Sequence, residues 1–266
     1  MTTDEKFDAG TPFDWGRTSA DYAKYRDIYP PVFYENIIAR GLCVRGQRAL
    51  DLGTGTGVLP RNLYRYGADW TGIDASAEQI AFAKQLAADD GLQIRFLSCA
   101  AEDLRFPAGS FDVITACQCF DYFDHAALAP LLSAMLKPDG RLLILYMAWL
   151  PQEDPIAHAS EELALQFHPK WTGAGYTRTP IAIPAPIAAY FDVVHREAYD
   201  VSLMFTRETW HGRMRACRGV GAALTPEALA AWDAQHRALL ERIAPERFTV
   251  LHHVASAELR VKQGIG

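Results

Sequence analysis

The segment that most constrains the fold is an apolar run that ends in an acid and then alternates glycine with threonine. It reads Ala-Leu-Asp-Leu-Gly-Thr-Gly-Thr-Gly over residues 49–57. Glycine adopts positive φ freely and leaves the backbone open to a ligand, so the run is typical of a strand that turns tightly into a helix. Unpaired N–H groups at the start of that helix add hydrogen-bond donors beside the turn. The segment predicts an α/β fold with a ligand site at the end of a strand.

The spacing of the glycines disfavours a dinucleotide as the ligand. The dinucleotide fingerprint is Gly-x-Gly-x-x-Gly, whereas here the third glycine comes one position early and Val58 stands where glycine or alanine is needed. Residues 70–74 predict a second strand that ends in Asp74, from which a carboxylate accepts hydrogen bonds from both ribose hydroxyls. The two features indicate an unphosphorylated nucleoside. A nucleotide-dependent oxidoreductase is the less favoured enzyme alternative.

Strands and helices are expected to alternate along most of the chain, which predicts a parallel sheet with helices on both faces. The first 40 residues contain a helical pattern over 20–40 that is interrupted at Pro30 and Pro31. Strands are predicted near 47–52, 69–74, 92–97, 111–117, 139–148, 190–200 and 247–260. Helices are predicted near 57–67, 76–89, 125–137, 206–217 and 225–242. The unbroken apolar run at 142–145 is typical of a central strand that is covered on both faces.

We expect one enzyme domain with additions, because a nucleotide-binding core of about 150 residues leaves too little chain for a second full core. Prolines and a glycine-rich run at 171–176 suggest an inserted lid, and an ordinary surface excursion is an equally good interpretation. The expected segments are an N-terminal helical cap (1–45), a cofactor-binding core (46–149), a lid or substrate insertion (150–189), and C-terminal strands and helices that complete the sheet (190–266).

Taken in order with two later segments, these residues resemble the class I S-adenosylmethionine-dependent methyltransferases of the small-molecule type. The later segments are the loop at 101–107 and the strand at 110–114, and the resemblance covers about residues 20–150. It implies a Rossmann-like sheet of seven strands, mostly parallel with the last one antiparallel, and S-adenosylmethionine as the cofactor. The implied activity is methyl transfer to a small metabolite, at oxygen or carbon, by in-line displacement with catalysis mainly by positioning.

The resemblance also implies which residues hold the cofactor. In that family the glycine turn lies under the methionine and ribose, the acid after the second strand holds the ribose hydroxyls, and the loop after the third strand receives the adenine. Many relatives carry an acid where this chain has Ala100, so the adenine amino group is left to Glu102, to Asp103 or to backbone groups alone. The expected cofactor contacts are Asp51, Gly53, Thr54, Gly55, Asp74, Ala75, Ala101, Glu102, Cys117 and Gln118.

Tyr22 and Arg26 are similar to an element that precedes the core in many small-molecule members, where the arginine reaches the methionine carboxylate of the cofactor. The planar guanidinium group binds both oxygens of a carboxylate. At helical spacing the two side chains share a face, so both are expected to close over the cofactor. A solvated helix with a surface arginine is the alternative interpretation.

Candidate proton acceptors are Asp121, His125 and His211. Displacement at a carbon activated by positive sulfur depends on alignment and desolvation, and a carboxylate acceptor needs no deprotonation. A phenol or enol needs a base, although a lone histidine is more often structural than catalytic. The expected substrate contacts are aromatic or cationic: Trp149, Trp171, Trp210, Arg215 and Arg218. Helical spacing places the two arginines on one helix face with His211. This face could bind an acidic substrate, and it could equally be a solvated face whose cations pair with acids.

Composition narrows the partners and the compartment. A net charge of −6 gives no basic field that would attract nucleic acid or an anionic membrane. The five cysteines form no Cys-x-x-Cys pair, and no leader, membrane-length apolar stretch or metal-ligand spacing is present, so we expect a cytoplasmic enzyme without a metal. It would act on a small molecule as a monomer or homodimer. The competing hypothesis is a non-catalytic regulatory or scaffold domain that binds S-adenosylmethionine.

Overall fold

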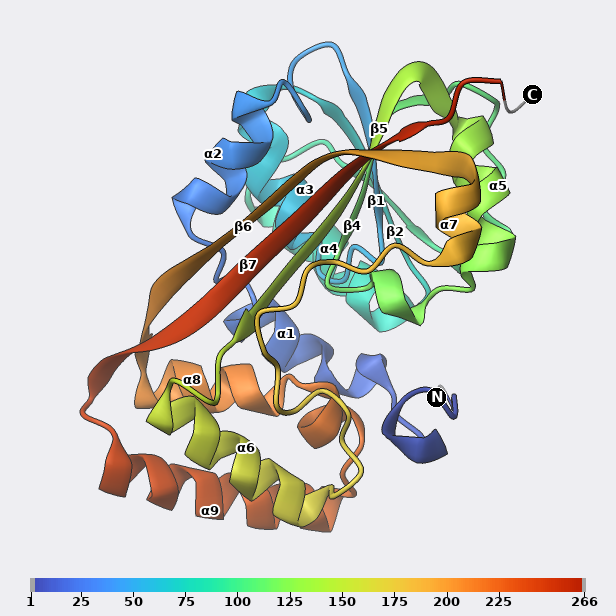
Figure 1. The fold of residues 1–266 in the computed structure, drawn as a ribbon. Coiled ribbons are helices and arrows are strands. Elements are labelled where there is room, and N and C mark those ends of the chain that lie inside the picture. Colours follow the sequence, from blue (N-terminus) through green and yellow to red (C-terminus); the bar gives the residue numbers. More distant parts are fainter. Residues whose placement is uncertain (1–2, 265–266) are drawn as a thin grey trace. The chain divides into compact units, whose positions relative to one another are not determined.

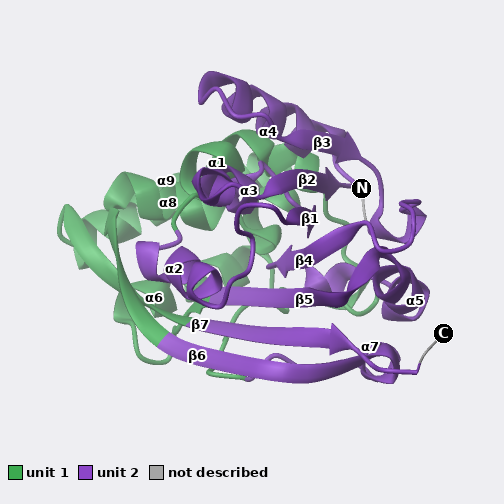
Figure 2. Ribbon diagram, turned by 90° about the horizontal axis from the view of Figure 1, so that it is seen from above, with its two compact units in different colours: residues 1–28, 148–179, 200–253 green, residues 29–147, 180–199, 254–266 purple. Residues whose placement is uncertain are grey.

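The computed structural model describes residues 3–264, so the outermost residues of the expected cap and of the expected C-terminal segment lie outside it. The chain divides into two compact units, which Figure 2 draws in different colours. Unit 1 consists of Met1–Ile28, Ala148–Thr179 and Asp200–His253. Unit 2 consists of Tyr29–Met147, Pro180–Tyr199 and Val254–Gly266. Each unit therefore combines segments that are far apart in the sequence.

Seven strands form one sheet in the order β3-β2-β1-β4-β5-β7-β6 (Figure 1). The strands are β1 (Arg48–Leu52), β2 (Asp69–Asp74), β3 (Arg95–Ser98), β4 (Phe111–Cys117), β5 (Leu136–Trp149), β6 (Phe191–Thr206) and β7 (Arg247–Val261). The four pairings among β3, β2, β1, β4 and β5 are parallel. β7 runs antiparallel to β5. Arg141, early in β5, binds Glu258, late in β7, whereas Leu150, just after β5, donates from its N–H to Leu251 O, early in β7, at 3.0 Å.

This sheet confirms the predicted fold class, including the central position of β5. Its apolar run at 142–145 is buried, as a strand covered on both faces requires. β3 begins at Arg95 rather than near residue 92, because Leu92 N donates to Ala87 O and closes the end of the preceding helix instead of pairing with β2. β5 is longer than predicted and begins at Leu136.

The helices are α1 (Ser19–Tyr25), α2 (Pro31–Ala39), α3 (Val58–Leu63), α4 (Ala77–Asp89), α5 (His125–Met135), α6 (Pro155–Phe167), α7 (Ala185–Tyr190), α8 (Arg207–Arg215) and α9 (Pro226–Ile243). Most of the longer ones begin where a side-chain oxygen accepts from backbone N–H groups. Ser76 caps α4 and Asp124 caps α5 in this way. These caps lie within a residue or two of the predicted helix starts.

Two helices lie in or at the end of the segment that the sequence predicts as a lid or substrate insertion. α6 begins at Pro155, after the Asp154 carboxylate has accepted from Ile156 N at 3.1 Å and Ala157 N at 2.9 Å. An acid followed by proline is a recognised signal for the start of a helix, but the predicted helices do not include α6. α7 follows at 185–190. The expected lid therefore contains regular structure at both of its ends.

The prediction that α8 continues past residue 215 is wrong. Ala216 N donates to Gly212 O at 3.0 Å and ends the helix, and a π-helical turn covers Arg218–Ala222. Arg218 is therefore not on the α8 face that carries His211 and Arg215. Gly221 explains part of the break, because a Cβ there would lie 2.4 Å from the Arg215 carbonyl oxygen.

Candidate active site

The glycine turn between β1 and α3 has the backbone that the sequence predicts. Gly53, Gly55 and Gly57 have φ values of +55°, +55° and +75°. A Cβ on Gly53 would lie 2.7 Å from the Cβ of Cys119, so only glycine fits there. Thr54 N donates to Ile73 O at 2.8 Å and ties the turn to β2. The turn is thus held at the carboxyl edge of the parallel strands, where ligands of open α/β sheets bind.

Asp51 lies under this turn and fixes it. Its carboxylate is 2% exposed and accepts from the hydroxyls of Thr54 at 2.7 Å and Thr115 at 2.6 Å. Burial raises the pKa of Asp51 to about 7, although both hydroxyls act in the opposite direction. Thr115 is a partner that the sequence analysis missed, and its only signal was a polar residue inside an apolar strand. Asp51 thus connects the glycine turn, through Thr54, to β4, through Thr115.

Replacing Asp51 with asparagine is expected to stabilise the protein at alkaline pH. A carboxyl group whose folded pKa exceeds its ordinary value of 3.8 costs stability progressively as pH rises towards about 7, because only the unfolded chain ionises easily. The Asp51→Asn variant loses this cost, which amounts to about 1.4 kcal/mol for each pH unit that separates the folded from the unfolded pKa. Urea unfolding at about pH 5 and about pH 8 should give a gain that is larger at the higher pH. An equal gain at both would contradict the shifted pKa.

Asp74, at the end of β2, presents a carboxylate that is anchored through both oxygens. Oδ2 accepts from Gly55 N at 2.9 Å and Oδ1 accepts from Ser76 N at 2.8 Å. Burial raises the pKa of Asp74, and the two backbone donors counteract this effect. Each carboxylate oxygen has a further lone pair, and the side chain is only partly buried. The arrangement leaves two fixed acceptors beside the glycine turn, and Ala75 follows them in an exposed position.

The loop after β3 forms a short 3-10 turn over Ala101–Asp103. Ala101 is buried in the core of unit 2. Glu102 is partly exposed, and its Oε1 accepts from Asp124 N at 2.9 Å. This bond connects the loop after β3 to the start of α5. One oxygen of Glu102 is therefore committed to structure, and the other carboxylate oxygen is left for a ligand.

The loop after β4 is fastened on both sides. The Cys117 thiol donates to the Tyr29 hydroxyl at 3.3 Å, and the Cys119 thiol donates to Leu52 O at 3.0 Å. Between them Gln118 has a φ of +67° and donates from Nε2 to Met147 O. Cys119 also packs against Gly53. Through Cys119, the loop that carries the predicted Cys117 and Gln118 is thus joined to the glycine turn.

Two of the candidate proton acceptors follow this loop. Asp121 is exposed in the 3-10 turn over Phe120–Tyr122. His125 is the first residue of α5, and its Nε2 lies 2.9 Å from Phe120 O. Because a carbonyl oxygen only accepts, Nε2 carries the proton and Nδ1 is the basic nitrogen of the neutral ring.

The third candidate, His211, takes part in a buried network in unit 1. Its Nδ1 lies 3.0 Å from Nδ1 of His236, whose Nε2 lies 3.0 Å from Ser160 Oγ. Its Nε2 lies 3.1 Å from Asp233 Oδ1. Burial lowers the pKa of His211 to about 4 and that of His236 to about 3. Both ring nitrogens of His211, on α8, therefore lie against side chains of α9, and His236 continues the network to Ser160 on α6.

The predicted tryptophans are buried in unit 1. Trp149 Nε1 donates to Glu161 Oε1, and Trp210 Nε1 donates to Ser160 Oγ at 2.9 Å. Trp171 is 6% exposed and contacts the backbone at Gly219, where a Cβ would lie 2.3 Å from the indole ring. These contacts place all three rings in the packing of unit 1.

The predicted arginines of unit 1 face carboxylates. Arg215 binds Asp233 at 3.1 Å and also Asp21. Arg218 binds Asp8 through Nε at 2.9 Å and Nη2 at 3.0 Å. The sequence predicts these two arginines as substrate contacts or as a solvated face paired with acids, and no local pattern identifies Asp8, Asp21 or Asp233 as the acids.

Tyr22 and Arg26 lie on one side of α1, as their spacing predicts. The Arg26 guanidinium lies 4.6 Å from the Tyr22 ring centroid, and its Nη2 donates to the Tyr22 hydroxyl at 3.3 Å. Both residues belong to unit 1, whereas the glycine turn belongs to unit 2. Their contact with a cofactor stays a prediction.

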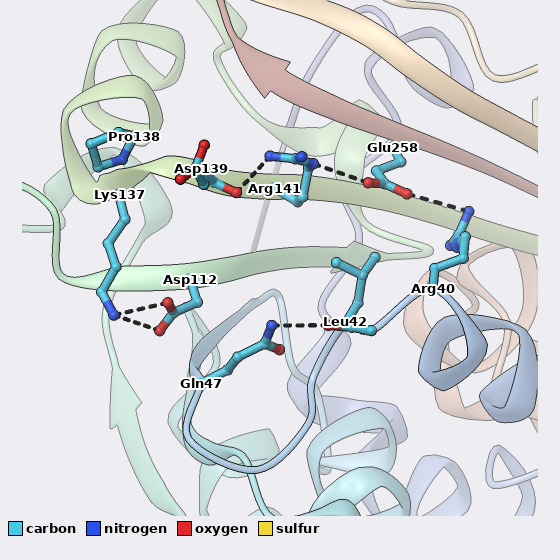
Figure 3. A pocket seen from close by; sticks show the side chains of 10 residues that line it. Arg40, Leu42, Gln47, Asp112, Lys137, Pro138, Asp139, Arg141 and Glu258 are labelled. Atoms are coloured by element: carbon cyan, nitrogen blue, oxygen red, sulfur yellow. Dashed lines mark hydrogen bonds and ion pairs between the residues drawn. The ribbon is translucent and has the colours of Figure 1, made fainter.

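A separate pocket of about 450 Å³ lies in unit 2 at the amino ends of the parallel strands (Figure 3). Lys137 binds Asp112 at 2.8 Å, and Arg141 binds Glu258 at 3.1 Å. Arg40 also approaches Glu258, at 3.8 Å. Five of the charged side chains that line this pocket thus pair with one another, and the pocket lies at the opposite edge of the sheet from the glycine turn.

Comparisons with known proteins agree with this geometry. Residues 49–140 match the model of a family described as a methyltransferase domain. A ubiquinone biosynthesis O-methyltransferase of Xanthomonas axonopodis pv. citri is 31% identical over 187 residues, which cover 70% of this chain and 76% of that protein. Its counterpart from Nitrosococcus oceani is 31% identical over 160 residues, which cover 59% of this chain and 67% of that protein.

The fold is also shared with solved structures. A phosphoethanolamine N-methyltransferase of Haemonchus contortus, in complex with phosphomonomethylethanolamine and S-adenosylhomocysteine, aligns with a TM-score of 0.52 at 18% identity. The alignment covers 90% of this chain and 57% of that one. At this identity the likeness establishes the fold. Within residues 3–264, every helix is too short or too polar to cross a membrane.

Proposed function

This chain belongs to the class I S-adenosylmethionine-dependent methyltransferases, and we propose that the methyl acceptor is a hydroxyl group on a small aromatic molecule. The enzyme uses S-adenosylmethionine as the methyl donor and acts on a small molecule. The relatives that share about 30% identity are named for O-methylation in ubiquinone biosynthesis, which supports a phenolic hydroxyl as the acceptor.

One observation carries the cofactor assignment in this chain. Asp74 is held by two backbone N–H groups and keeps a lone pair on each oxygen beside a turn of positive-φ glycines. Two fixed acceptors suit the adjacent hydroxyls of a ribose. Cys119 fills the space that a side chain on Gly53 would need, so the turn keeps its glycine and its positive φ beside Asp74. The residues present therefore fit S-adenosylmethionine.

When bound, the cofactor supplies a methyl group on positively charged sulfur. The chain then has to orient the acceptor oxygen, exclude water and receive the hydroxyl proton. We assign the proton to His125 Nδ1, which is the basic nitrogen because Nε2–H donates to Phe120 O. Asp121, four residues earlier, is the second candidate.

We further propose that the enzyme is cytoplasmic, a monomer or homodimer, and without nucleic-acid substrates. Five cysteines without a Cys-x-x-Cys pair support a reducing compartment. The net charge of −6 disfavours polyanions.

The test is methyl transfer from S-adenosylmethionine to a panel of phenols, followed by mass spectrometry. The panel should contain catechol, caffeate and para-hydroxybenzoate, together with amine and carboxylate acceptors of similar size. We expect O-methylated phenols and no product from the amines. Exclusive methylation of the amines or carboxylates would overturn the proposed acceptor, while the cofactor assignment would stand if calorimetry shows binding of S-adenosylhomocysteine.

A further inference from the structure

Gln118, at the carboxyl end of β4, has a backbone conformation that side chains rarely adopt. Its φ of +67° lies in the left-handed region that favours glycine. Among residues 3–264, the other non-glycine residues with positive φ are Asp8 and Ala9 in unit 1 and Cys43 in the loop before β1. Of these described residues with positive φ, Gln118 is the one that lies at the carboxyl edge of the parallel strands. Strain of this kind gathers at functional sites.

The neighbours of Gln118 impose this conformation. Gln118 N donates to Leu145 O at 2.9 Å, which continues the pairing of β4 with β5 past the last strand residue. The thiols of Cys117 and Cys119 fasten the flanking positions to Tyr29 and Leu52. Three anchors within three residues leave the backbone at Gln118 little freedom to relax.

A further contact, with Met147, fixes which way the Gln118 side-chain amide faces. The side chain lies against Met147 O, and a carbonyl oxygen only accepts, so the NH2 group must point to it. The amide oxygen Oε1 therefore points away from Met147. No side chain or backbone N–H in the described part of the chain donates to Oε1. The Gln118 side chain thus offers one neutral hydrogen-bond acceptor of fixed orientation in the loop that adjoins the glycine turn.

The sheet order indicates what this acceptor meets. Along the carboxyl edge, β2 carries Asp74, β1 leads into the glycine turn, and β4 with Gln118 comes next. If Asp74 on β2 held the ribose and the glycine turn after β1 held the next part of the cofactor, β4 would be the next strand along this edge. Cys119 packs against Gly53, so the Gln118 loop directly adjoins that turn.

We propose that Oε1 of Gln118 accepts a hydrogen bond from the hydroxyl group of the methyl acceptor and so selects a hydroxyl over groups that cannot donate. This inference rests on the proposed function. Holding the O–H hydrogen orients the lone pairs of the acceptor oxygen for attack on carbon. A neutral amide does not take the proton, so Gln118 recognises and orients the neutral hydroxyl. The hydroxyl carries one hydrogen, which therefore leaves Gln118 Oε1 and passes to the separate base, His125 Nδ1, as the new C–O bond forms.

The test compares two probes of equal shape, para-hydroxybenzoate and para-toluate, which differ by OH against CH3. Their binding is measured by calorimetry in saturating S-adenosylhomocysteine, for the wild type and for Gln118→Met, which keeps the size and the left-handed strain. We expect the wild type to prefer the hydroxyl probe by about five- to ten-fold. The Gln118→Met variant should bind both probes equally, within about two-fold.

A second variant separates strain from recognition. Gln118→Gly relieves the positive φ, so it should unfold at a higher denaturant concentration than the methionine variant while also losing the hydroxyl preference. An unchanged hydroxyl preference in the methionine variant would overturn the inference. If the wild type shows no preference for the hydroxyl probe, the proposed acceptor fails, and the inference fails with it.

Discussion

Replacing Asp74 with alanine is expected to weaken the binding of S-adenosylmethionine by about 1–3 kcal/mol, or roughly five- to a hundred-fold in Kd. The variant loses both ribose acceptors. It also frees Gly55 N and Ser76 N, which the carboxylate now holds at 2.9 and 2.8 Å, so the glycine turn loses part of its support. Titration calorimetry with S-adenosylmethionine and S-adenosylhomocysteine measures the effect on both ligands.

The matched control is Asp69→Ala, at the other end of the same strand. The Asp69 side chain is 78% exposed and lies 4.0 Å from Arg48, so its removal should leave the affinity unchanged within error. Asp74→Asn keeps one acceptor oxygen and should fall between the alanine variant and the wild type. Equal affinities of the Asp74→Ala variant and the wild type would remove Asp74 from the cofactor site.

Replacing Asp8 with alanine is expected to destabilise unit 1 by about 3–5 kcal/mol. Asp8 is fully buried and binds the guanidinium of Arg218, which is 7% exposed. Asp8 also accepts from Thr172 N at 2.7 Å, and the rings of Phe7 and Phe13 lie 4.8 and 5.7 Å from the guanidinium carbon. Truncation would leave a buried cation without its carboxylate, which is the costly case.

Urea unfolding followed by tryptophan fluorescence is the suitable measurement, because Trp171 and Trp210 lie in unit 1. Glu208→Ala is the control. Its ion pair with Lys24 is exposed at both ends, at 62% and 64%, so solvent screens it and its loss should change the stability little. If both variants lost the same small amount of stability, the buried pair would not hold the N-terminal segment in place.

Local signals predicted most of the sheet and of the cofactor turn. The glycines at 53, 55 and 57 adopt the positive φ that a tight strand-to-helix turn requires, so their conformation followed from residue type. Asp74 was found because the end of a strand has a defined position in a parallel sheet. α6 was missed although Asp154 and Pro155 mark its start, because the proline content of the surrounding segment was given more weight.

Partners distant in sequence could not be predicted. Arg218 lies 210 residues from Asp8, and no local pattern connects them. The same holds for His211 and His236, whose rings come within 3.0 Å only because α8 and α9 pack together. The amide orientation of Gln118 depends on Met147 of the neighbouring strand. Periodicity indicates which face a residue occupies, whereas its partner depends on how the elements pack.

The thiol of Cys119 has a chemical consequence for an enzyme that handles an electrophilic methyl group. A thiolate beside such a group would itself become alkylated to a thioether, and the protein would consume its own reagent. Burial, together with the nearby Asp51 and Asp74, raises the pKa of the Cys119 thiol well above its usual range. The sulfur therefore stays protonated and poorly nucleophilic at neutral pH. Burial, aided by the two acids that shape the cofactor turn, thus keeps this thiol in the form that is least open to methylation.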